Sequence, residues 1–391
     1  MASANHKLMV LILPSWYPTE RYPVGGVFIQ EQARALTRRT DVEVGVLFVD
    51  RVSVKAWLHR PKLLKMSKEE GVPVYRLLMP SLRGVWPFLH SVWAVLACAG
   101  LRRQNVRPDI LHAHVSVPAG FSGALIKLLW RVPLVITEHI GPFSQLMRNR
   151  RSAFATRLSM SRADTVVAVS AALRDQIMSY PRLRRQIDVI PNVVNVGEFP
   201  VKAETRQTCE PARLLFVGEM DTSIKGVDYL IGAVSILRKR GVEVTLDLVG
   251  DGRNRREYET QARRLRVADL CRYHGMLRHE EVVEMMHGYD VLVVPSLAET
   301  FGVVVVEAMA AGVPVVATRC GGPEEIVTPD LGVLVAKADS AALADGITDV
   351  LSRPGDFPPA HLRRVAEVRF GHETISARLV ELYREVLGRS G

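Results

Sequence analysis

The chain has 391 residues, of which 48% are hydrophobic and 24% charged, and its formal net charge is +10. This composition is typical of a globular protein of two or three domains, and it excludes disorder, collagen and coiled coil as the structure of the whole chain. Cys98, Cys209, Cys271 and Cys320 form no Cys-x-x-Cys pair, which excludes a zinc ribbon or a disulfide scaffold and suits a reducing compartment. The apolar run before Pro14 is too short for a signal peptide, so we expect a cytoplasmic protein.

The charge is distributed unevenly along the chain. Residues 1–200 contain 27 Lys and Arg and 13 Asp and Glu, a net charge of +14, whereas the remainder contains 24 and 28, a net charge of −4. A strongly basic half is expected to face an anionic surface or substrate. Nucleic acid is not the expected partner, because aromatic residues make up only 6% of the chain and no nucleic-acid-binding signature is present.

Short apolar runs recur along the chain and predict strands. Most are continuous rather than alternating, as expected of strands buried on both faces of a parallel sheet. In the first half the predicted strands are Leu8–Leu13, Val44–Val49, Asp109–His112, Pro133–Thr137, Thr165–Val169 and Asp188–Ile190. In the second half they are Arg213–Val217, Val244–Val249, Arg272–His274, Val291–Val294, Pro314–Ala317 and Gly332–Val335. Segments of helical periodicity lie between them, among them Val27–Arg39, Val227–Lys239 and Arg255–Val267.

The strand–helix alternation occurs twice, which predicts two doubly wound α/β domains. The apolar rhythm breaks near Val196–Pro211, so we expect an N-terminal domain at 1–198 and a C-terminal domain at 199–372. After Pro359 the pattern indicates one charged helix, Glu373–Leu387; residues 373–391 can pack back on the N-terminal domain. Ligands bind at the carboxyl ends of such strands, so two domains of this type would line a cleft.

One segment has the composition of a membrane helix. Gly84–Leu101 contains no Lys, Arg, Asp or Glu and is followed by Arg102–Arg103. Its 18 residues only reach the threshold for a spanning helix, and Pro87 and His90 interrupt it. We therefore expect a helix that is buried or lies at a membrane interface rather than one that crosses the bilayer.

The most informative motif extends from Pro295 to Pro314. It begins where the predicted strand Val291–Val294 ends and continues into a helix from about Gly302, whose free N–H groups favour an anion. Glu299 lies just before this helix and Glu307 lies inside it. One interpretation is that Glu299 only complements the helix dipole and that Glu307 is a solvated residue. However, Glu307 lies in an otherwise apolar helix, where a carboxylate needs a partner or a ligand. Two carboxylates beside an anion site are suited to binding sugar hydroxyls.

The Glu, seven residues, Glu pattern followed by Ala-Met-Ala-Ala-Gly-Val-Pro resembles the signature of the retaining family 4 glycosyltransferases of the GT-B fold. The resemblance covers nearly the whole chain. Further matching segments are Ser15–Pro18, Pro23–Ile29, His112–His114, Thr137–His139, Ile190–Asn192, Phe216–Gly218, Lys225–Gly226 and Leu248–Gly252.

The resemblance implies a set of functional residues. Catalytic roles fall to Glu299 at the sugar hydroxyls, His139 at the sugar and Lys225 at the leaving diphosphate, and Glu307 would bind the ribose. Met276 and Leu277 would line the nucleotide base. The other donor-binding residues are Gly25, Gly26, Gly218, Gly252, Thr300, Phe301, Gly302 and Val303. His112 and His114 lack a third metal ligand at a suitable spacing, and the resemblance implies neither a metal nor a cofactor.

One residue departs from the family pattern. Glu219 occupies the position where the family usually carries an arginine that contacts the diphosphate. An acid there cannot bind phosphate. Either Arg253 or Arg319 substitutes for the missing base, or the leaving group is less well stabilised.

The expected activity is transfer of a sugar, with retention at the anomeric carbon, from a nucleotide-diphosphate sugar to a saccharide or lipid-linked saccharide. UDP is preferred over GDP from family prevalence, and the products would be cell-surface polysaccharides or glycoconjugates. The basic first half makes an anionic membrane surface a further expected partner. Two alternatives remain, a sugar-nucleotide epimerase of the same architecture and a non-enzymatic nucleotide-sugar binding protein.

Overall fold

The computed structural model describes residues 7–59, 64–81, 86–184, 186–201 and 211–390. Part of the expected linker, residues 202–210 with Cys209, lies outside these ranges, as do residues 84–85 of the uncharged segment. The chain divides into two compact units. Unit 1 consists of Met1–Val193 and His372–Gly391, and unit 2 of Val194–Gly371.

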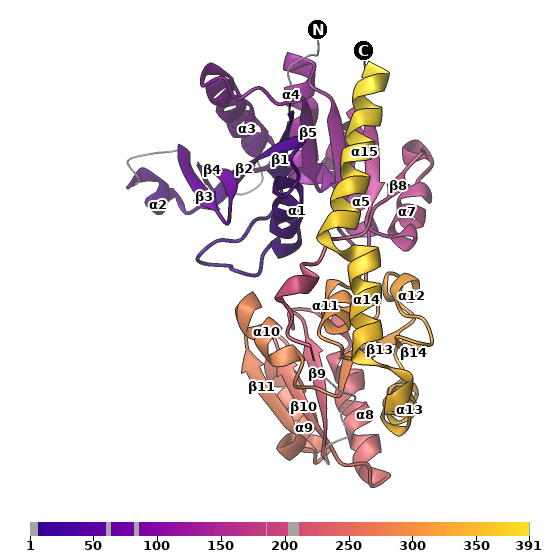
Figure 1. The fold of residues 1–391 in the computed structure, drawn as a ribbon. Helices are drawn as coiled ribbons and strands as arrows, with labels where there is room; N and C mark the ends of the chain where they lie inside the picture. The colour runs from indigo at the N-terminus through magenta and orange to yellow at the C-terminus, as the bar shows by residue number, and fades with distance from the viewer. Residues whose placement is uncertain (1–6, 60–63, 82–85, 185, 202–210, 391) are drawn as a thin grey trace. The chain divides into compact units, whose positions relative to one another are not determined.

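Unit 1 is built on a sheet with the strand order β3-β4-β2-β1-β5-β6-β7-β8 (Figure 1). Its strands are β1 (Leu8–Pro14), β2 (Val42–Val52), β3 (Leu64–Glu69), β4 (Val72–Pro80), β5 (Ile110–His114), β6 (Leu134–Glu138), β7 (Thr165–Ala168) and β8 (Asp188–Val189). Its helices are α1 (Val27–Thr37), α2 (Val54–Leu58), α3 (Trp86–Arg103), α4 (Phe121–Trp130), α5 (Ser144–Met147), α6 (Arg150–Arg162), α7 (Ala171–Met178) and α15 (His372–Ser390).

The sequence correctly predicts β1, β2 and β5 to β8 of this sheet but misses β3 and β4, although β4 is largely buried. β3 pairs antiparallel with β4, whereas the other neighbouring strands pair in parallel. β3 lies at the edge of the sheet and carries Lys65, Lys68 and Glu69, a charged composition that is typical of edge strands. It therefore lacks the continuous apolar run on which the prediction depended.

The helices of unit 1 cover both faces of the sheet, which explains the apolar runs. α1 and α15 pack against each other, and α3, α4 and α6 pack side by side. In α4, a Cβ on Gly123 would come within 2.7 Å of the Leu134 side chain. Leu134 is one residue before Val135, which belongs to the core beneath α1 and α15. Since adjacent strand residues point to opposite faces, α4 lies on the opposite face from α1 and α15.

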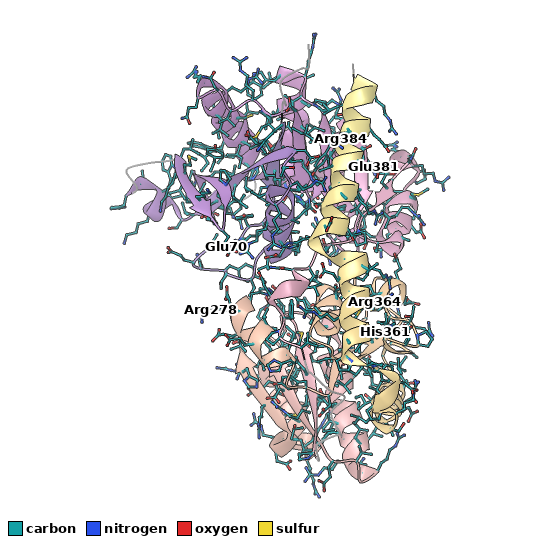
Figure 2. The ribbon with its side chains drawn as sticks, viewed as in Figure 1. Glu70, Arg278, His361, Arg364, Glu381 and Arg384 are labelled. Carbon is teal, nitrogen blue, oxygen red and sulfur yellow. The ribbon has the colours of Figure 1, made fainter. Side chains whose placement is uncertain are left out.

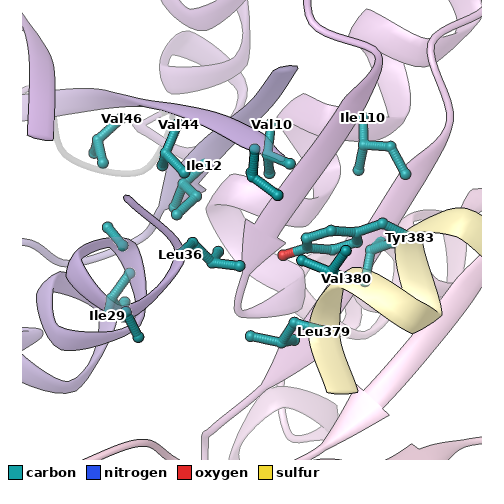
Figure 3. Packing of buried hydrophobic residues seen from close by; sticks show 14 of the residues in the cluster. Val10, Ile12, Ile29, Leu36, Val44, Val46, Ile110, Leu379, Val380 and Tyr383 are labelled. Atoms are coloured by element: carbon teal, nitrogen blue, oxygen red, sulfur yellow. The ribbon is translucent and has the colours of Figure 1, made fainter. Parts of the chain in front are cut away.

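The C-terminal helix α15 is part of the unit 1 core (Figure 3). Leu379 and Tyr383 on α15 are at most 1% exposed and belong to one cluster with Ile12 and Leu36. Burying side chains of this size contributes about 1.5–3 kcal/mol each. Arg384 of the same helix, labelled in Figure 2, places Nη2 2.6 Å from a carboxylate oxygen of Asp41.

The sequence predicts one helix after Pro359, and the structure contains two. α14 (Pro359–Phe370) ends where Gly371 adopts an extended conformation, and α15 follows directly. The buried residues of α14, Pro359, Leu362, Ala366 and Phe370, recur at helical spacing, so the prediction of one helix was wrong. α14 packs on α11 (Val303–Ala310) and belongs to unit 2, whereas α15 belongs to unit 1.

Unit 2 contains a parallel sheet with the strand order β11-β10-β9-β12-β13-β14. Its strands are β9 (Ala212–Val217), β10 (Val244–Val249), β11 (Cys271–Gly275), β12 (Val291–Val294), β13 (Val315–Thr318) and β14 (Gly332–Val335). Its remaining helices are α8 (Val227–Lys239), α9 (Arg255–Arg264), α10 (His279–Met286), α12 (Pro323–Ile326) and α13 (Ser340–Ser352). These strands match the predicted ones within one residue at each end.

The uncharged segment of the first half forms α3. Its residues Ala94, Ala97 and Cys98 are buried, whereas Val92 and Leu96 are exposed. Within the described ranges, the structure contains no helix with the length and hydropathy that crossing a membrane requires. α3 is therefore a partly exposed helix of unit 1, where the sequence predicted a buried or interfacial helix.

Candidate active site

The predicted donor-binding residues of unit 2 follow the carboxyl ends of neighbouring strands. Gly218 follows β9, Gly252 follows β10, Met276 and Leu277 follow β11, and Glu299 follows β12. These four strands are adjacent in the sheet and parallel, so the loops emerge at one edge. This edge is where open α/β sheets bind ligands.

Glycines allow the loops at this edge to approach one another closely. A Cβ on Gly250 would lie 1.9 Å from the carbonyl oxygen of Gly218, and one on Gly252 would lie 2.3 Å from the carbonyl carbon of Met220. Gly226 adopts φ of 64°, and a Cβ there would lie 2.0 Å from the carbonyl oxygen of Pro295. Any side chain at these positions would force the loops apart.

Lys225 and Glu299 form a hydrogen-bonded ion pair at the centre of this edge. Lys225 Nζ lies 2.7 Å from Glu299 Oε2, and the two side chains are 31% and 17% exposed. Leu297 N donates to the carbonyl oxygen of Ile224 at 2.7 Å, which fixes the loop that carries Glu299 to the turn that carries Lys225. Burial alone would lower the pKa of Lys225, but the charges of Glu299 and Glu219 raise it above its ordinary value. Lys225 therefore remains a cation at neutral pH.

The N-terminus of α11 lies beside this pair. Gly302 adopts φ of 91° before the helix, and no side chain caps it, so the first N–H groups of α11 are available for an anion. Phe301 is 3% exposed, and a Cβ on Gly322 would lie 2.3 Å from its Cα. Glu299 N donates to Cys320 O at 3.1 Å, and Gly322 N donates to Glu299 O at 2.9 Å. The loop after β13 thus holds the segment 299–302 in place.

Glu307 lies on α11 and has a partner that the sequence did not predict. Its side chain is 13% exposed, and its Oε1 lies 4.0 Å from Nδ1 of His279 at the start of α10. His279 Nε2 in turn lies 3.8 Å from Glu198 Oε2. The sequence indicated that Glu307 needs a partner, because its carboxylate lies in an apolar helix. Nothing in the sequence identified His279 as that partner.

Met276 is 43% exposed and Leu277 is partly buried. A methionine that follows a strand is usually a core residue. Met276, however, does not belong to the core. Its side chain is accessible to a ligand at the carboxyl end of β11.

The acid at Glu219 and the two arginines suggested as substitutes for the missing base all lie on the surface. Glu219 is exposed, and its charge acts on Lys225. The two arginines suggested as substitutes are also exposed, Arg253 by 82% and Arg319 by 59% of the side chain. Each faces a carboxylate of its own, at 3.6 Å from Asp221 and at 3.9 Å from Glu324 respectively.

Gly25 and Gly26 precede α1 in unit 1, and both are buried. Gly26 adopts φ of 75°, and a Cβ there would lie 2.5 Å from the carbonyl oxygen of Trp16. A Cβ on Gly25 would lie 2.3 Å from the ring of Tyr22. The turn therefore requires glycine at Gly26, whether or not it also binds a ligand, whereas a side chain at Gly25 would only displace the exposed Tyr22 ring.

His139 follows β6 and belongs to a buried polar cluster. His139 Nε2 lies 2.9 Å from Nδ1 of His114 on β5, and Phe28 packs on the His139 ring at a centroid distance of 4.7 Å. Burial lowers the pKa of His139 to about 3, and His112 adds to this effect, whereas the side chain of Asn192 opposes it. His139 is consequently neutral at physiological pH.

The residue before it, Glu138, holds the backbone at this strand end. Its carboxylate accepts hydrogen bonds from Ser116 N at 3.0 Å, Ser116 Oγ at 2.7 Å, and the backbone N–H groups of His139 and Ile140 at 2.9 Å each. Burial raises the pKa of Glu138, and these hydrogen bonds counteract the rise. No cluster of three or more His, Cys, Asp and Glu side chains able to hold a metal ion occurs in the described part of the chain.

The predicted residues thus fall into separate groups. Lys225 and Glu299 are in contact, with Gly218 beside the Lys225 side chain. Glu307 lies on the helix that follows Glu299 and faces His279. His139, Gly25 and Gly26 belong to unit 1.

Two units, each an α/β sheet covered by helices, are characteristic of transferases of the GT-B fold, and comparisons with known proteins identify the family. The family described as "Glycosyltransferase Family 4" matches residues 25–198, and the family described as "Glycosyl transferases group 1" matches residues 211–353. The chain therefore belongs to the family 4 glycosyltransferases.

Its curated relatives include two well-covered enzymes. Glycogen synthase of Mycobacterium tuberculosis is 33% identical over 307 residues, covering 73% of this chain and 72% of the relative. D-inositol 3-phosphate glycosyltransferase of Xylanimonas cellulosilytica is 31% identical over 396 residues, covering 93% and 92%. The chain is accordingly a glycosyltransferase.

Solved structures establish the fold. Sucrose-phosphate synthase from Thermosynechococcus elongatus matches with a TM-score of 0.80 at 20% identity, over 98% of this chain and 100% of that one. Anabaena HepE in complex with UDP-glucose matches with a TM-score of 0.74 at 20% identity, over 97% and 100%. The fold is GT-B.

Proposed function

We propose that this glycosyltransferase uses a nucleotide-diphosphate sugar, with UDP as the nucleotide, and retains the configuration of the anomeric carbon without a metal ion. The observation that carries the proposal is the Lys225–Glu299 pair at 2.7 Å beside the uncapped N-terminus of α11. A cation and free N–H groups at one strand edge suit a diphosphate, and the carboxylate suits sugar hydroxyls. The UDP-glucose complex of Anabaena HepE, which has the same fold, favours UDP.

The proposed roles follow from these positions. Lys225 and the N–H groups of Thr300–Val303 stabilise the negative charge that develops on the departing diphosphate, which is commonly the largest contribution to such catalysis. Glu299 accepts hydrogen bonds from the sugar hydroxyls. Glu307 accepts hydrogen bonds from the ribose, and Met276 and Leu277 contact the base. His139 contacts the sugar.

We propose a saccharide or lipid-linked saccharide as the acceptor, in the synthesis of cell-surface polysaccharides or glycoconjugates. Exposed apolar side chains on unit 1 support a membrane-bound acceptor. Phe88, Val92 and Leu96 on α3 are 42%, 54% and 59% exposed, and their spacing of four places them on one helix face. On α4, Leu128 and Leu129 are 64% and 58% exposed.

The charge of the same half of the chain complements an anionic bilayer. Residues 1–200 carry a net charge of +14, and α3 ends in Arg102 and Arg103. Basic residues near an anionic bilayer contribute about 1 kcal/mol each. We therefore place the protein in the cytoplasm, attached peripherally to the inner face of the plasma membrane.

The donor is tested by incubating the protein with UDP-, GDP- and ADP-sugars and measuring nucleotide release with and without a saccharide or polyprenyl-diphosphate-saccharide acceptor. Acceptor-dependent release of UDP supports the proposal. If only GDP or only ADP is released, UDP is the wrong nucleotide. If the donor sugar is epimerised and no nucleotide is released, the protein does not transfer sugar from these donors.

Membrane attachment is tested by co-sedimentation of the full chain with lipid vesicles. Binding is expected to require anionic lipid, to fall with salt, and to weaken in Leu96→Glu. The matched control is Val368→Glu, which changes a residue of unit 2 that is 62% exposed. Equal binding to neutral vesicles, or equal weakening by the control, would contradict membrane attachment through α3.

A further inference from the structure

His139 is the end of a chain of buried polar side chains that begins on α15. The Tyr383 hydroxyl lies 2.6 Å from Nδ1 of His112, and His112 Nε2 lies 2.7 Å from Thr137 Oγ1. The rings of His112 and His114 are stacked at 4.4 Å. His114 Nδ1 then meets His139 Nε2 at 2.9 Å. Figure 3 shows Tyr383 projecting from α15 toward the sheet.

Gln32 on α1 contacts two rings of this chain. Its amide nitrogen lies 3.4 Å from His112 Nδ1 and 3.3 Å from His114 Nε2, and the residue is 4% exposed. An amide NH2 group only donates hydrogen bonds, and a neutral imidazole has one donor and one acceptor nitrogen. With the amide nitrogen facing both rings, His114 Nε2 is the acceptor of its pair. His112 Nδ1 has one lone pair, to which the Tyr383 hydroxyl donates at 2.6 Å, and Gln32 is a second, more distant donor to it.

The acceptor role of His114 Nε2 determines which nitrogen carries the proton in His114 and in His139. Because His114 Nε2 is an acceptor, the proton of His114 is on Nδ1, and this N–H donates to His139 Nε2. His139 must then carry its own proton on Nδ1. Burial lowers the pKa of all three histidines, to about 3 for His112 and His139, so each ring is neutral and has a single N–H.

The remaining nitrogen of His139, Nδ1, is buried and makes no hydrogen bond of standard geometry within the described residues. The side chain of Asn192 acts on the His139 ring through a looser contact, which opposes the lowering of its pKa. A buried N–H without a well-aligned acceptor is unfavourable, so a ligand oxygen at this position would compete with Asn192 for it. The cluster therefore ends in a donor that Asn192 satisfies only loosely.

We propose that Gln32 and His114 are positioning residues that fix His139 as its Nδ1–H tautomer. His139 then donates a hydrogen bond to an oxygen atom of the sugar substrate and does not serve as a base. The donation to the sugar rests on the function proposed above, whereas the tautomer is a property of the unliganded protein. If the amide of Gln32 presented its oxygen instead, every donor and acceptor in the chain would be reversed, and His139 would present a lone pair.

The test is long-range ¹⁵N–¹H NMR on the full chain with ring-¹⁵N-labelled histidine and no substrate. Signals of His139 are assigned with His139→Gln. We expect a protonated Nδ1 and an unprotonated Nε2 at pH 7. A protonated Nε2 alone, or a doubly protonated ring, would overturn the proposal. Because no substrate is present, this outcome is independent of whether the protein uses a UDP-sugar.

Two variants test the role of Gln32. Gln32→Met removes the shared donor, and we expect the single tautomer of His139 to become a mixture of two. Gln32→Glu places an acceptor between the rings and is expected to move the proton of His139 to Nε2. The matched control, Gln30→Glu on the same helix, should leave the tautomer unchanged. An unchanged Nδ1–H tautomer in both Gln32 variants would show that Gln32 does not fix it.

Discussion

Replacing Lys225 by methionine should abolish most of the activity while the protein stays folded. The two charges of the Lys225–Glu299 pair lie 2.7 Å apart, which corresponds to about 6 kcal/mol of attraction at an effective dielectric constant of 20 and about 1.5 kcal/mol in water. The side chains are 31% and 17% exposed, and desolvation offsets much of the attraction. We therefore expect Lys225→Met to lower the free energy of unfolding by only about 1–2 kcal/mol.

The effect on turnover should be larger, because Lys225 also stabilises the leaving diphosphate. Removing one preorganised electrostatic group typically lowers kcat by about 10²–10³. Steady-state nucleotide release measures kcat, and urea unfolding measures stability. Glu299→Gln and the double variant complete a thermodynamic cycle: the double variant should recover stability relative to Lys225→Met, but not activity.

The matched control is Lys239→Met, which removes an exposed cation near the end of α8 and should change neither quantity. Activity within threefold of wild type in Lys225→Met would refute the role of Lys225 at the leaving group. A loss of activity that merely parallels the loss of stability would show that the pair is structural.

The remaining predictions concern Glu307, Glu219 and the buried histidines. Glu307→Ala should lower kcat/KM for the UDP-sugar about ten- to a hundredfold and abolish discrimination between UDP and its 2′,3′-dideoxy analogue in calorimetry; preserved discrimination would contradict a ribose contact. Glu219→Arg should tighten UDP binding, because it removes an acid that acts on Lys225 and adds a base; a clear loss of affinity would show instead that Glu219 supports Lys225. Stability should fall as the pH is lowered through 6.5, since burial lowers the pKa of His90 to about 4 and those of His112 and His139 to about 3, so the unfolded chain takes up protons that the folded chain does not. Each of these histidines should lower the free energy of unfolding by about 1.4 kcal/mol at pH 5.5. In His90→Asn, urea unfolding should show a pH dependence that is smaller by this amount. Equal stability of the wild type at pH 7.5 and 5.5 would contradict the buried neutral state.

The sequence predicted the two sheets well because their strands are buried on both faces. Strands such as β1 and β12 are continuous apolar runs, which leave few alternatives. β3 and β4 were missed because β3 is an exposed, charged edge strand and β4 contains Pro73 and Arg76. α14 was also missed, although its buried residues Pro359, Leu362 and Ala366 recur at helical spacing. Uninterrupted apolar runs were thus readable, and a buried strand interrupted by polar residues or proline was not.

The predicted site residues come from local motifs, and the sequence offers no prediction of contacts between distant segments. Glu299 and Glu307 lie in one continuous motif, and Lys225 was identified from a short resemblance. Gln32 and Tyr383, in contrast, reach the His139 cluster from α1 and from α15, and Tyr383 is 271 residues from His112. No periodicity or spacing in the sequence encodes such a contact, because it arises only when the helices pack on the sheet.

The most direct test of the proposed activity is an NMR time course of the reaction with UDP-glucose, whose sugar is α-linked, and an acceptor identified by the donor and acceptor assays. ³¹P signals report release of UDP, and ¹H signals report the configuration of the new glycosidic bond as it forms. The proposed function predicts that UDP appears together with an α-linked product in a solution treated with a chelator. A β-linked first product, or no transfer until a divalent metal is added, would contradict it.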